Sequence, residues 1–430
     1  MFTGAEGSKD RWEVINLYRV FFVLSLAVNI VFVCLAATNK IPYVTQRKAA
    51  FALGNIMASV MIRNEVVLFG LYWLVVRLFS EWPPLWFRDF LTSSLLQIGG
   101  FHSGLAMASL MWIVYVIITL GQHAAFTQTG VIVIASVLGA FIAISILAAF
   151  PLVRFFHHNV FEMVHRFSGW SALAALWIFE VLADNYNAHT RTYEVTIKHF
   201  IQHQDFWFCI VTTYLILQPW LMTTKVQVET IVPSPKVCLL KYKGGVKPGI
   251  LGRISRKPLL EWHAFGIISE GPQSGVHYML VTALGDFTRG LIEDPPKEVY
   301  TRRFKFVGLP YCVPLYRKGL AVATGSGLGI TLSVSLQSDD RFHLIWVARD
   351  MENCVGSIIM DMLRRADQKR LHLYDTIETG RPNLPRLVVD MAREIGAEVV
   401  FVTSNRQVSR SVVKACREAH ISCFSPIWDS

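Results

Sequence analysis

The chain has 430 residues, of which 53% are hydrophobic and only 17% are charged. Its mean hydropathy of +0.41 is above that of an ordinary soluble domain, so the composition argues against a purely soluble protein and predicts a membrane protein. The net charge of +10 indicates attraction to a membrane surface. The sequence has no basic stripe with interleaved aromatic residues, so nothing in it indicates nucleic-acid binding.

Six apolar runs in the first half are long enough to cross a bilayer core, which takes about 20 residues. Both termini then lie on one side of the membrane, and the excess of Lys and Arg near the span ends on that side favours the cytoplasm. The first run is too long for the apolar core of a cleaved signal peptide. We therefore predict an integral, multi-pass, six-span transmembrane domain at 1–225, with spans near 13–37, 50–79, 94–120, 130–150, 158–182 and 206–222.

Ionisable residues inside spans are functional candidates. The second span carries Arg63 and Glu65, which are either a structural ion pair facing the bundle interior or a ligand-handling pair. They are the only specific support for a transporter, because no inverted repeat with broken helices is seen.

Two histidines lie at matching depths. His102, in the third span within GGFHSG, is roughly 12 Å from the cytoplasmic end, and His165, in the fifth span, is roughly 8–12 Å from it. A b-type haem held between two helices needs one histidine from each at the same depth. The alternative is a pair of hydrogen-bonded core histidines. His157 and His158 are expected at the interface as anchors.

The second half changes character at about residue 225. Short β-rich segments separated by turn residues predict a small antiparallel β-barrel at 226–317. Strands then alternate with helices, which predicts an α/β subdomain with a parallel sheet at 318–430. Its first strand leads into Gly325-Ser-Gly327-Leu-Gly329, a turn that offers backbone N–H groups and a helix N-terminus to a pyrophosphate. Seven cysteines without a CxxC pair favour reduced core residues over metal clusters.

Six spans with histidines on the third and fifth, followed by such a module, resemble the ferric reductase and NADPH oxidase superfamily. The segments GGFHSG and VFEMVHRFSGW are more similar to the TmpA-like integral membrane proteins of filamentous fungi. The resemblance implies a cytoplasmic ferredoxin-reductase-like module with FAD on the barrel and NAD(P)H at the sheet, and haem iron between His102 and His165. Two-haem relatives carry a second histidine 13–14 residues further on, where this chain has Tyr115-Val116 and Ile178-Phe179. At most one inner haem is supported.

The resemblance also implies the cofactor-binding residues. His263-Ala-Phe265-Gly stands where relatives have His-Pro-Phe-Thr, and GDFTRGL matches a flavin-diphosphate segment. GLPYC replaces Asp-Gly-Pro-Tyr-Gly, and Thr403-Ser404-Asn405 replaces Cys-Gly-Pro. The implied set is His263, Phe265, Gly285, Thr288, Arg289, Gly325, Gly327, Gly329, Arg349, which suits a ribose phosphate, and Trp428, placed where relatives stack an aromatic ring on the flavin.

Two functions follow. The first is a membrane-bound oxidoreductase that passes electrons from NAD(P)H through FAD, with or without one inner haem, to an unidentified small-molecule acceptor such as a lipophilic or secondary metabolite. The second is a catalytically degenerate relative that acts as a sensor or scaffold in fungal development or signalling. The departures from the flavin and nicotinamide motifs motivate it.

Overall fold

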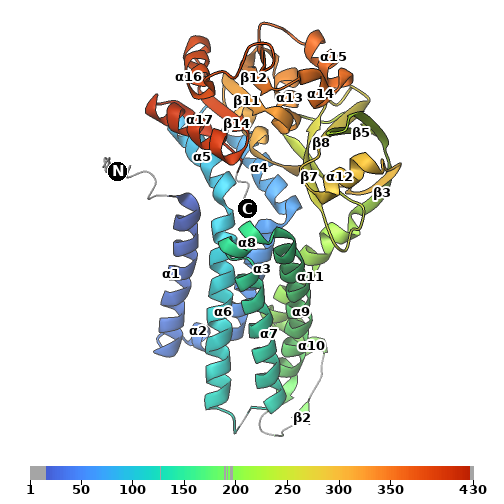
Figure 1. The fold of residues 1–430 in the computed structure, drawn as a ribbon. Coiled ribbons are helices and arrows are strands. Elements are labelled where there is room, and N and C mark those ends of the chain that lie inside the picture. The colour runs from blue at the N-terminus through green and yellow to red at the C-terminus, as the bar shows by residue number, and fades with distance from the viewer. Residues whose placement is uncertain (1–15, 126, 188–189, 191, 194–196, 427–430) are drawn as a thin grey trace, which may run out of the picture. The chain divides into compact units, whose positions relative to one another are not determined.

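The computed structural model describes residues 16–125, 127–187, 190, 192–193 and 197–426 (Figure 1). These residues form two compact units. One covers 16–64 and 97–219, and the other covers 65–96 and 220–426. Residues 65–96, which the sequence prediction placed in the transmembrane domain, therefore fold with the second unit.

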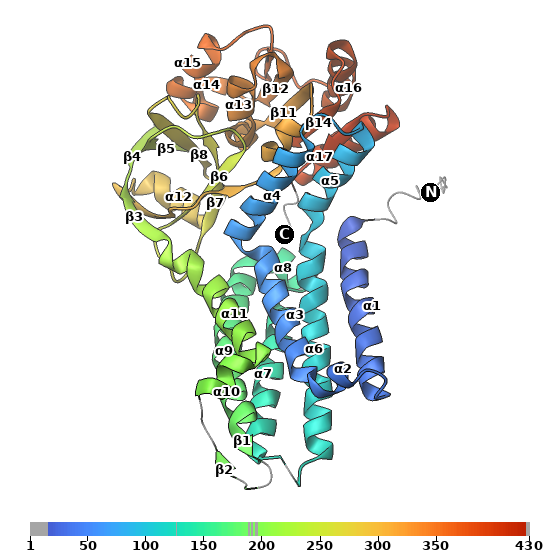
Figure 2. The same ribbon diagram turned by 180° about the vertical axis from the view of Figure 1, so that it is seen from behind.

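The first unit is helical (Figure 2). Two short strands, β1 (Tyr186–Asn187) and β2 (Thr192–Tyr193), pair near the end of α9. The helices are α1 (Leu17–Ala37), α2 (Pro42–Gln46), α3 (Lys48–Arg63), α6 (Gly99–Gln122), α7 (Thr129–Ala148), α8 (Pro151–Phe156), α9 (His158–Asn185), α10 (Ile197–Gln202) and α11 (Gln204–Leu221).

Fewer helices qualify as membrane spans than the sequence predicts. Within the described residues, α1, α6 and α7 are long and apolar enough to cross a membrane. A fourth span results only if α3 and α4 (Glu65–Phe79) are counted together, although they are bent by 67° at a break. The prediction of a six-span bundle is thus not supported, because the other helices of this unit are too short or too polar for that test.

Small residues on α6 bring its backbone against α1. A Cβ on Gly100 would lie 2.2 Å from the carbonyl oxygen of Tyr18, and one on Gly104 would lie 2.7 Å from that of Phe22. This is the close packing that small residues four apart allow in membrane helices. The glycines around His102 therefore make room for a neighbouring helix.

The predicted second span, 50–79, is broken at Asn64. Glu65, the first residue of α4, binds Arg253 at 2.5 Å and Arg302 at 2.8 Å. Both arginines lie on strands of the second unit, and the Glu65 side chain is only 12% exposed. The prediction that Glu65 faces the interior of a helical bundle was therefore wrong, and the transporter hypothesis loses this support.

The second unit contains a curled antiparallel sheet followed by a parallel sheet, which is the predicted ferredoxin-reductase-like arrangement. The curled sheet has the order β3-β9-β6-β7-β8-β5-β4, with β10 added to β6. Its strands are β3 (Thr223–Gln227), β4 (Glu229–Ser234), β5 (Val237–Lys243), β6 (Ile250–Ser255), β7 (His263–Ile268), β8 (Val276–Thr282), β9 (Glu298–Arg302) and β10 (Phe306–Val307), with α12 (Asp286–Glu293) between β8 and β9.

The parallel sheet has the order β13-β12-β11-β14-β15, and apolar clusters cover both faces, as an all-parallel sheet requires. Its elements, after the 3₁₀ segment η2 (Leu309–Leu315), are β11 (Gly319–Thr324), η3 (Gly325–Gly327), α13 (Leu328–Gln337), η4 (Asp339–Arg341), β12 (Phe342–Ala348), α14 (Met351–Val355), α15 (Ser357–Arg365), β13 (Leu371–Asp375), α16 (Leu384–Ile395), β14 (Val399–Thr403), α17 (Arg406–Glu418) and β15 (Ser422–Phe424).

Helices α4 and α5 (Leu85–Gln97) pack against this module (Figure 2). Arg88 of α5 is 4% exposed and holds both carboxylate oxygens of Glu398 at 2.9 and 3.0 Å. It also donates to the carbonyl of Leu315 at 2.7 Å. Burial acts to raise the pKa of Glu398, but hydrogen bonds from Arg88 and the Arg317 amide outweigh it, so this pKa is lowered. The hairpin of α4 and α5 is thereby fixed to the start of the parallel sheet.

We expect Glu398→Gln to lower the free energy of unfolding of the second unit by about 3 kcal/mol, because it leaves the buried charge of Arg88 without its partner. Urea unfolding of the detergent-solubilised chain, followed by circular dichroism, measures this. Glu418→Gln is the control, because Glu418 makes only an exposed contact with Lys414 at 3.9 Å and such pairs contribute about 0–1 kcal/mol. Equal losses in the two variants would contradict the importance of this pair.

Candidate functional sites

The glycine turn lies at the point where the strand order of the parallel sheet reverses. Strand β11 pairs with β12 on one side and β14 on the other. In open parallel sheets of this kind, ligands bind outside the carboxyl ends of the strands at such a switch point. Gly325, directly after β11, has φ +51°, and a Cβ on it would meet nothing within 4 Å. This turn is therefore placed as a nucleotide-binding turn is.

The turn is fastened to β14. A Cβ on Gly327 would lie 2.4 Å from the carbonyl oxygen of Thr403, so only glycine permits this approach. The hydroxyls of Thr324 and Ser404 are 2.5 Å apart, and Trp346 donates to the carbonyl of Gly325 at 2.9 Å. Thr403 and Ser404, which replace the expected Cys and Gly, thus hold the turn in place.

The carboxyl ends of the neighbouring strands β12 and β13 carry Arg349 and Asp375. Arg349 follows β12 and is exposed, so it is accessible to a phosphate. Asp375, the last residue of β13, accepts hydrogen bonds from the amides of Met351, Ile377 and Asp350 at 2.8–3.1 Å. These bonds lower the pKa of Asp375. The carboxylate of Asp375 therefore binds backbone amides, whereas Arg349 is exposed to solvent.

The flavin candidates gather at β7 and the N-terminus of α12. The ring of His263 stacks on that of Phe287, with centroids 3.9 Å apart and an interplanar angle of 17°. Phe265, two residues along β7, is half-buried and packs against the barrel core. Gly285 precedes α12, and a Cβ there would meet nothing within 4 Å. The first amides of α12 have no partner inside the helix and can bind an anion.

Two of the polar candidates already have partners. The hydroxyl of Thr288 accepts from the amides of Leu284 and Gly285 at 3.0 Å each and donates to the carbonyl of Gly285. It thus caps α12. Arg289 forms a 2.6 Å pair with Asp286. Both side chains therefore have local partners at the start of α12.

Gly266 stands where the flavin motif of the relatives has a threonine, and its surroundings explain this difference. A Cβ on Gly266 would lie 2.4 Å from the carbonyl oxygen of Gly329. Beside it, the hydroxyl of Ser333 donates to the carbonyl of Ile267 and accepts from the amide of Ser269. The glycine that replaces the expected threonine therefore lets β7 touch the first turn of α13. This contact brings the flavin candidates beside the glycine turn.

The barrel also contains a polar cluster that the sequence reading missed. Lys305 donates to the hydroxyl of Thr301 at 3.1 Å and lies 5.9 Å from the ring centroid of Tyr242, which stacks on His277. Burial lowers the pKa of Lys305 to about 8 and also lowers that of His277. The Tyr242 hydroxyl and His277 Nε2 are buried without a hydrogen-bond partner in the described part of the chain. Polar residues at paired inward positions of β5 and β8 were the signal.

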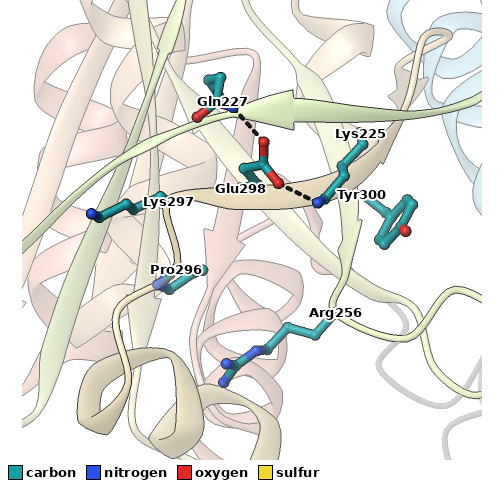
Figure 3. Close-up of a pocket in the computed structure, with 7 residues that line it drawn as sticks. All are labelled: Lys225, Gln227, Arg256, Pro296, Lys297, Glu298 and Tyr300. Carbon is teal, nitrogen blue, oxygen red and sulfur yellow. Dashed lines mark hydrogen bonds and ion pairs between the residues drawn. The ribbon is translucent and has the colours of Figure 1, made fainter.

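A cavity of about 660 Å³ is lined by residues of β3 and β9, by the segment before β9 and by Arg256, which follows β6 (Figure 3). Lys225 and Gln227 both contact the carboxylate of Glu298, and Arg256 and Lys297 add two further cations to the lining. None of the predicted flavin or nucleotide residues lines it.

His102 and His165, both in the first unit, face each other. Their ring centroids are 6.4 Å apart. Nδ1 of His102 lies 2.9 Å from the carbonyl oxygen of Ser59, and Nδ1 of His165 lies 3.1 Å from that of Ser145. Because a carbonyl only accepts, each Nδ1 carries a proton, and in the neutral form of such a ring the lone pair is on Nε2. Hydrogen bonding of this kind orients metal-ligating histidines.

The other histidine and cysteine candidates, and Trp428, complete the set of predicted residues. His158 lies 3.5 Å from Glu162, which also contacts Arg166 at 3.8 Å. All seven cysteines are free thiols, and the described residues contain no group of three or more His, Cys, Asp or Glu suited to a metal ion. Trp428 lies outside the described residues.

Comparison with known proteins identifies relatives over almost the whole chain. The family model "Adenylate-forming reductase 03009, C-terminal domain" matches residues 309–430. Adenylate-forming reductases 06235 and 03009 of Coprinopsis cinerea are 30% and 28% identical over 432 and 428 residues, and each match covers 98% of this chain but 41% of the relative. The chain thus spans about two fifths of the curated relatives it matches.

Among solved structures, the ferredoxin reductase in carbazole 1,9a-dioxygenase is 15% identical. That match has a TM-score of 0.37 and covers 48% of this chain and 70% of that one.

We expect Gly327→Ala to destabilise the second unit by about 1–3 kcal/mol, because the new Cβ must push the turn away from Thr403. A thermal unfolding series in detergent measures the effect as a lower midpoint. Gly290→Ala is the control, since its Cβ would make only an ordinary 3.6 Å contact with Arg256. An unchanged midpoint for Gly327→Ala would show that the turn is not held against β14.

Proposed function

We propose that the chain is a flavin-dependent oxidoreductase that takes reducing equivalents from NAD(P)H and works at a membrane. The observation that carries this proposal is the glycine turn at the strand-order switch point, joined to β7 through the contact of Gly266 with Gly329. A flavin on β7 and a nicotinamide at the turn would share that boundary. The relatives in Coprinopsis cinerea are named adenylate-forming reductases, which also supports a reducing role.

The residues present fit both cofactors. The open space at Gly285, the first amides of α12 and Arg289 would hold the flavin diphosphate, and His263 with Phe287 would form an aromatic wall beside it. The turn from Gly325 to Gly329 and the start of α13 would hold the nicotinamide nucleotide, with Arg349 at its ribose phosphate. When bound, the nicotinamide would supply a hydride, and the flavin would accept it and release single electrons.

The helical unit fits one haem. Two metal–nitrogen bonds of about 2 Å each take up most of the 6.4 Å between the ring centroids of His102 and His165, and the half-rings take up the remainder. A Cβ on Gly169, one turn beyond His165, would meet nothing within 4 Å, so this face of α9 has room. Arg63 and Arg154 lie within electrostatic reach of His165 and would suit haem propionates.

The acceptor is expected on the cytoplasmic side or dissolved in the bilayer. Tyr115-Val116 and Ile178-Phe179 occupy the places where an outer pair of histidines would be needed, so a complete haem path across the membrane is not proposed. A lipophilic small molecule is the class of acceptor that this arrangement favours. The resemblance to ferric reductases and TmpA-like proteins is part of this proposal.

The second candidate is a non-catalytic sensor or scaffold. One observation favours it: Thr288 and Arg289, two polar flavin candidates, are already bound to Gly285 and Asp286. This hypothesis predicts that the cellular phenotype does not need the nucleotide turn.

An optical spectrum of the detergent-solubilised chain, before and after addition of NADPH, separates the two functions. The oxidoreductase predicts flavin bands near those of bound FAD that bleach under anaerobic conditions. Absence of both flavin bands and a Soret band in protein supplied with FAD and haem would rule it out and leave the scaffold.

We expect Gly285→Ala to lower the flavin content severalfold without changing thermal stability, because its Cβ would enter only the space assigned to the diphosphate. The ratio of flavin absorbance to protein measures this. Gly290→Ala, on the same helix, should retain wild-type flavin. Equal flavin content in both variants would move the flavin away from α12.

His165→Ala should abolish the Soret band but leave the flavin bands in place, because the two sites are built from different units. His158→Ala is the matched control, since its side chain is 66% exposed and contacts Glu162. A Soret band that persists in His165→Ala would return His102 and His165 to the role of core histidines.

A further inference from the structure

The outward face of the α4–α5 hairpin is unusually apolar for the surface of a soluble module. Six large hydrophobic side chains are between 45% and 70% exposed. Trp73 and Arg77, Leu74 and Leu78, and Trp86 and Phe90 are each four residues apart, so each pair lies on one helix face. The exposed set, called here the hairpin face, is Trp73, Leu74, Leu78, Trp82, Trp86 and Phe90.

The opposite face of the hairpin is firmly packed. Tyr72 and Val75 of α4 and Leu95 of α5 are buried in the cluster that contains Leu315 and Phe401. With the pair of Arg88 and Glu398, this fixes which side of each helix points outward. The exposure of the tryptophans is therefore a consequence of the fold.

The acidic side chains of the hairpin also lie on its packed side, and a basic one lies on its exposed side. All three of its acids face the module: Glu65 binds Arg253 and Arg302, Glu81 binds Arg341 at 2.6 Å, and Asp89 accepts from Tyr316 and Ser422. Arg77 is the exposed cation among the apolar residues. A face of tryptophan, leucine and arginine without acid complements an anionic lipid surface.

The kind of apolar residue distinguishes this face from the candidate spans. The exposed large hydrophobics recorded on α1, α6 and α7 are all aliphatic, as Val31, Ile118 and Val133 illustrate. Four of the six on the hairpin face are aromatic. Tryptophan is enriched at the level of the lipid headgroups, whereas aliphatic side chains face the hydrocarbon.

The chain also ties the hairpin to a candidate span. Only Ile98 separates the end of α5 from the start of α6, and only Asn64 separates α3 from α4.

We propose that the hairpin face lies in the headgroup region of the bilayer as an interfacial anchor for the reductase-like module, with anionic phospholipid as its partner. This inference rests on the membrane embedding in the proposed function. It assigns to residues 65–96 a surface role in place of the spanning role that their hydropathy indicates.

Site-specific photocrosslinking tests the proposal. The full chain, carrying p-benzoylphenylalanine at Leu78 or at Trp86, is reconstituted in liposomes of phosphatidylcholine and phosphatidylserine, irradiated and analysed by mass spectrometry. The same photoreactive residue at Val133, 56% exposed on α7, is the lipid-facing control, and at Ile377, 61% exposed in the parallel-sheet subdomain, it is the aqueous control.

Lipid adducts at Leu78 and Trp86 within about twofold of those at Val133, with few at Ile377, support the anchor. Crosslinks to protein, or yields as low as at Ile377, overturn it while Val133 still reports lipid. If Val133 also gives no lipid adduct, the membrane embedding of the proposed function fails first, and the anchor fails with it.

Discussion

Two close approaches of backbone to backbone hold the second unit together at the place where the cofactor sites are proposed. Gly327 lies against the carbonyl of Thr403, and Gly266 lies against that of Gly329. A side chain at either glycine would separate elements that now touch. Together they place the end of β11, the start of α13 and the strand β7 at one boundary. The proposed flavin and nicotinamide sites depend on this boundary, because it brings a barrel site and a sheet site together within one module.

The hairpin of α4 and α5 shows why hydropathy alone misplaces elements. A run such as 65–79 is apolar enough to be read as half of a span, but its single acid, Glu65, finds its two arginines on β6 and β9, almost 190 and 240 residues later. Such distant pairing leaves no local pattern in the sequence. The buried Arg88 is a second case, since its partner Glu398 lies 310 residues away. Long-range ion pairs, together with apolar packing of Tyr72, Val75 and Leu95 in the cluster of Leu315 and Phe401, fix these helices in the second unit.

Local patterns were sufficient where local physics decides. The strands at 237–243, 263–268, 319–324 and 342–348 follow from β-branched runs bounded by turn residues, and the glycine turn follows from its place between strand and helix. The final helix α17 and strand β15 were not predicted. Strand β15 has only three residues, whereas α17 is strongly amphipathic, so its helical pattern is present in the sequence. The cluster around Lys305 was missed because its members come from strands distant in sequence.

For the histidine pair, the position predicted from the sequence can be compared directly with the structure. Depth counting predicted that His102 and His165 share a level, and their rings do face each other. Both rings bond through Nδ1 to the backbone carbonyl of a neighbouring helix, His102 to Ser59 of α3 and His165 to Ser145 of α7. The depth of the pair could be counted along the two spans, whereas these carbonyl partners come from other helices and leave no local pattern in the sequence.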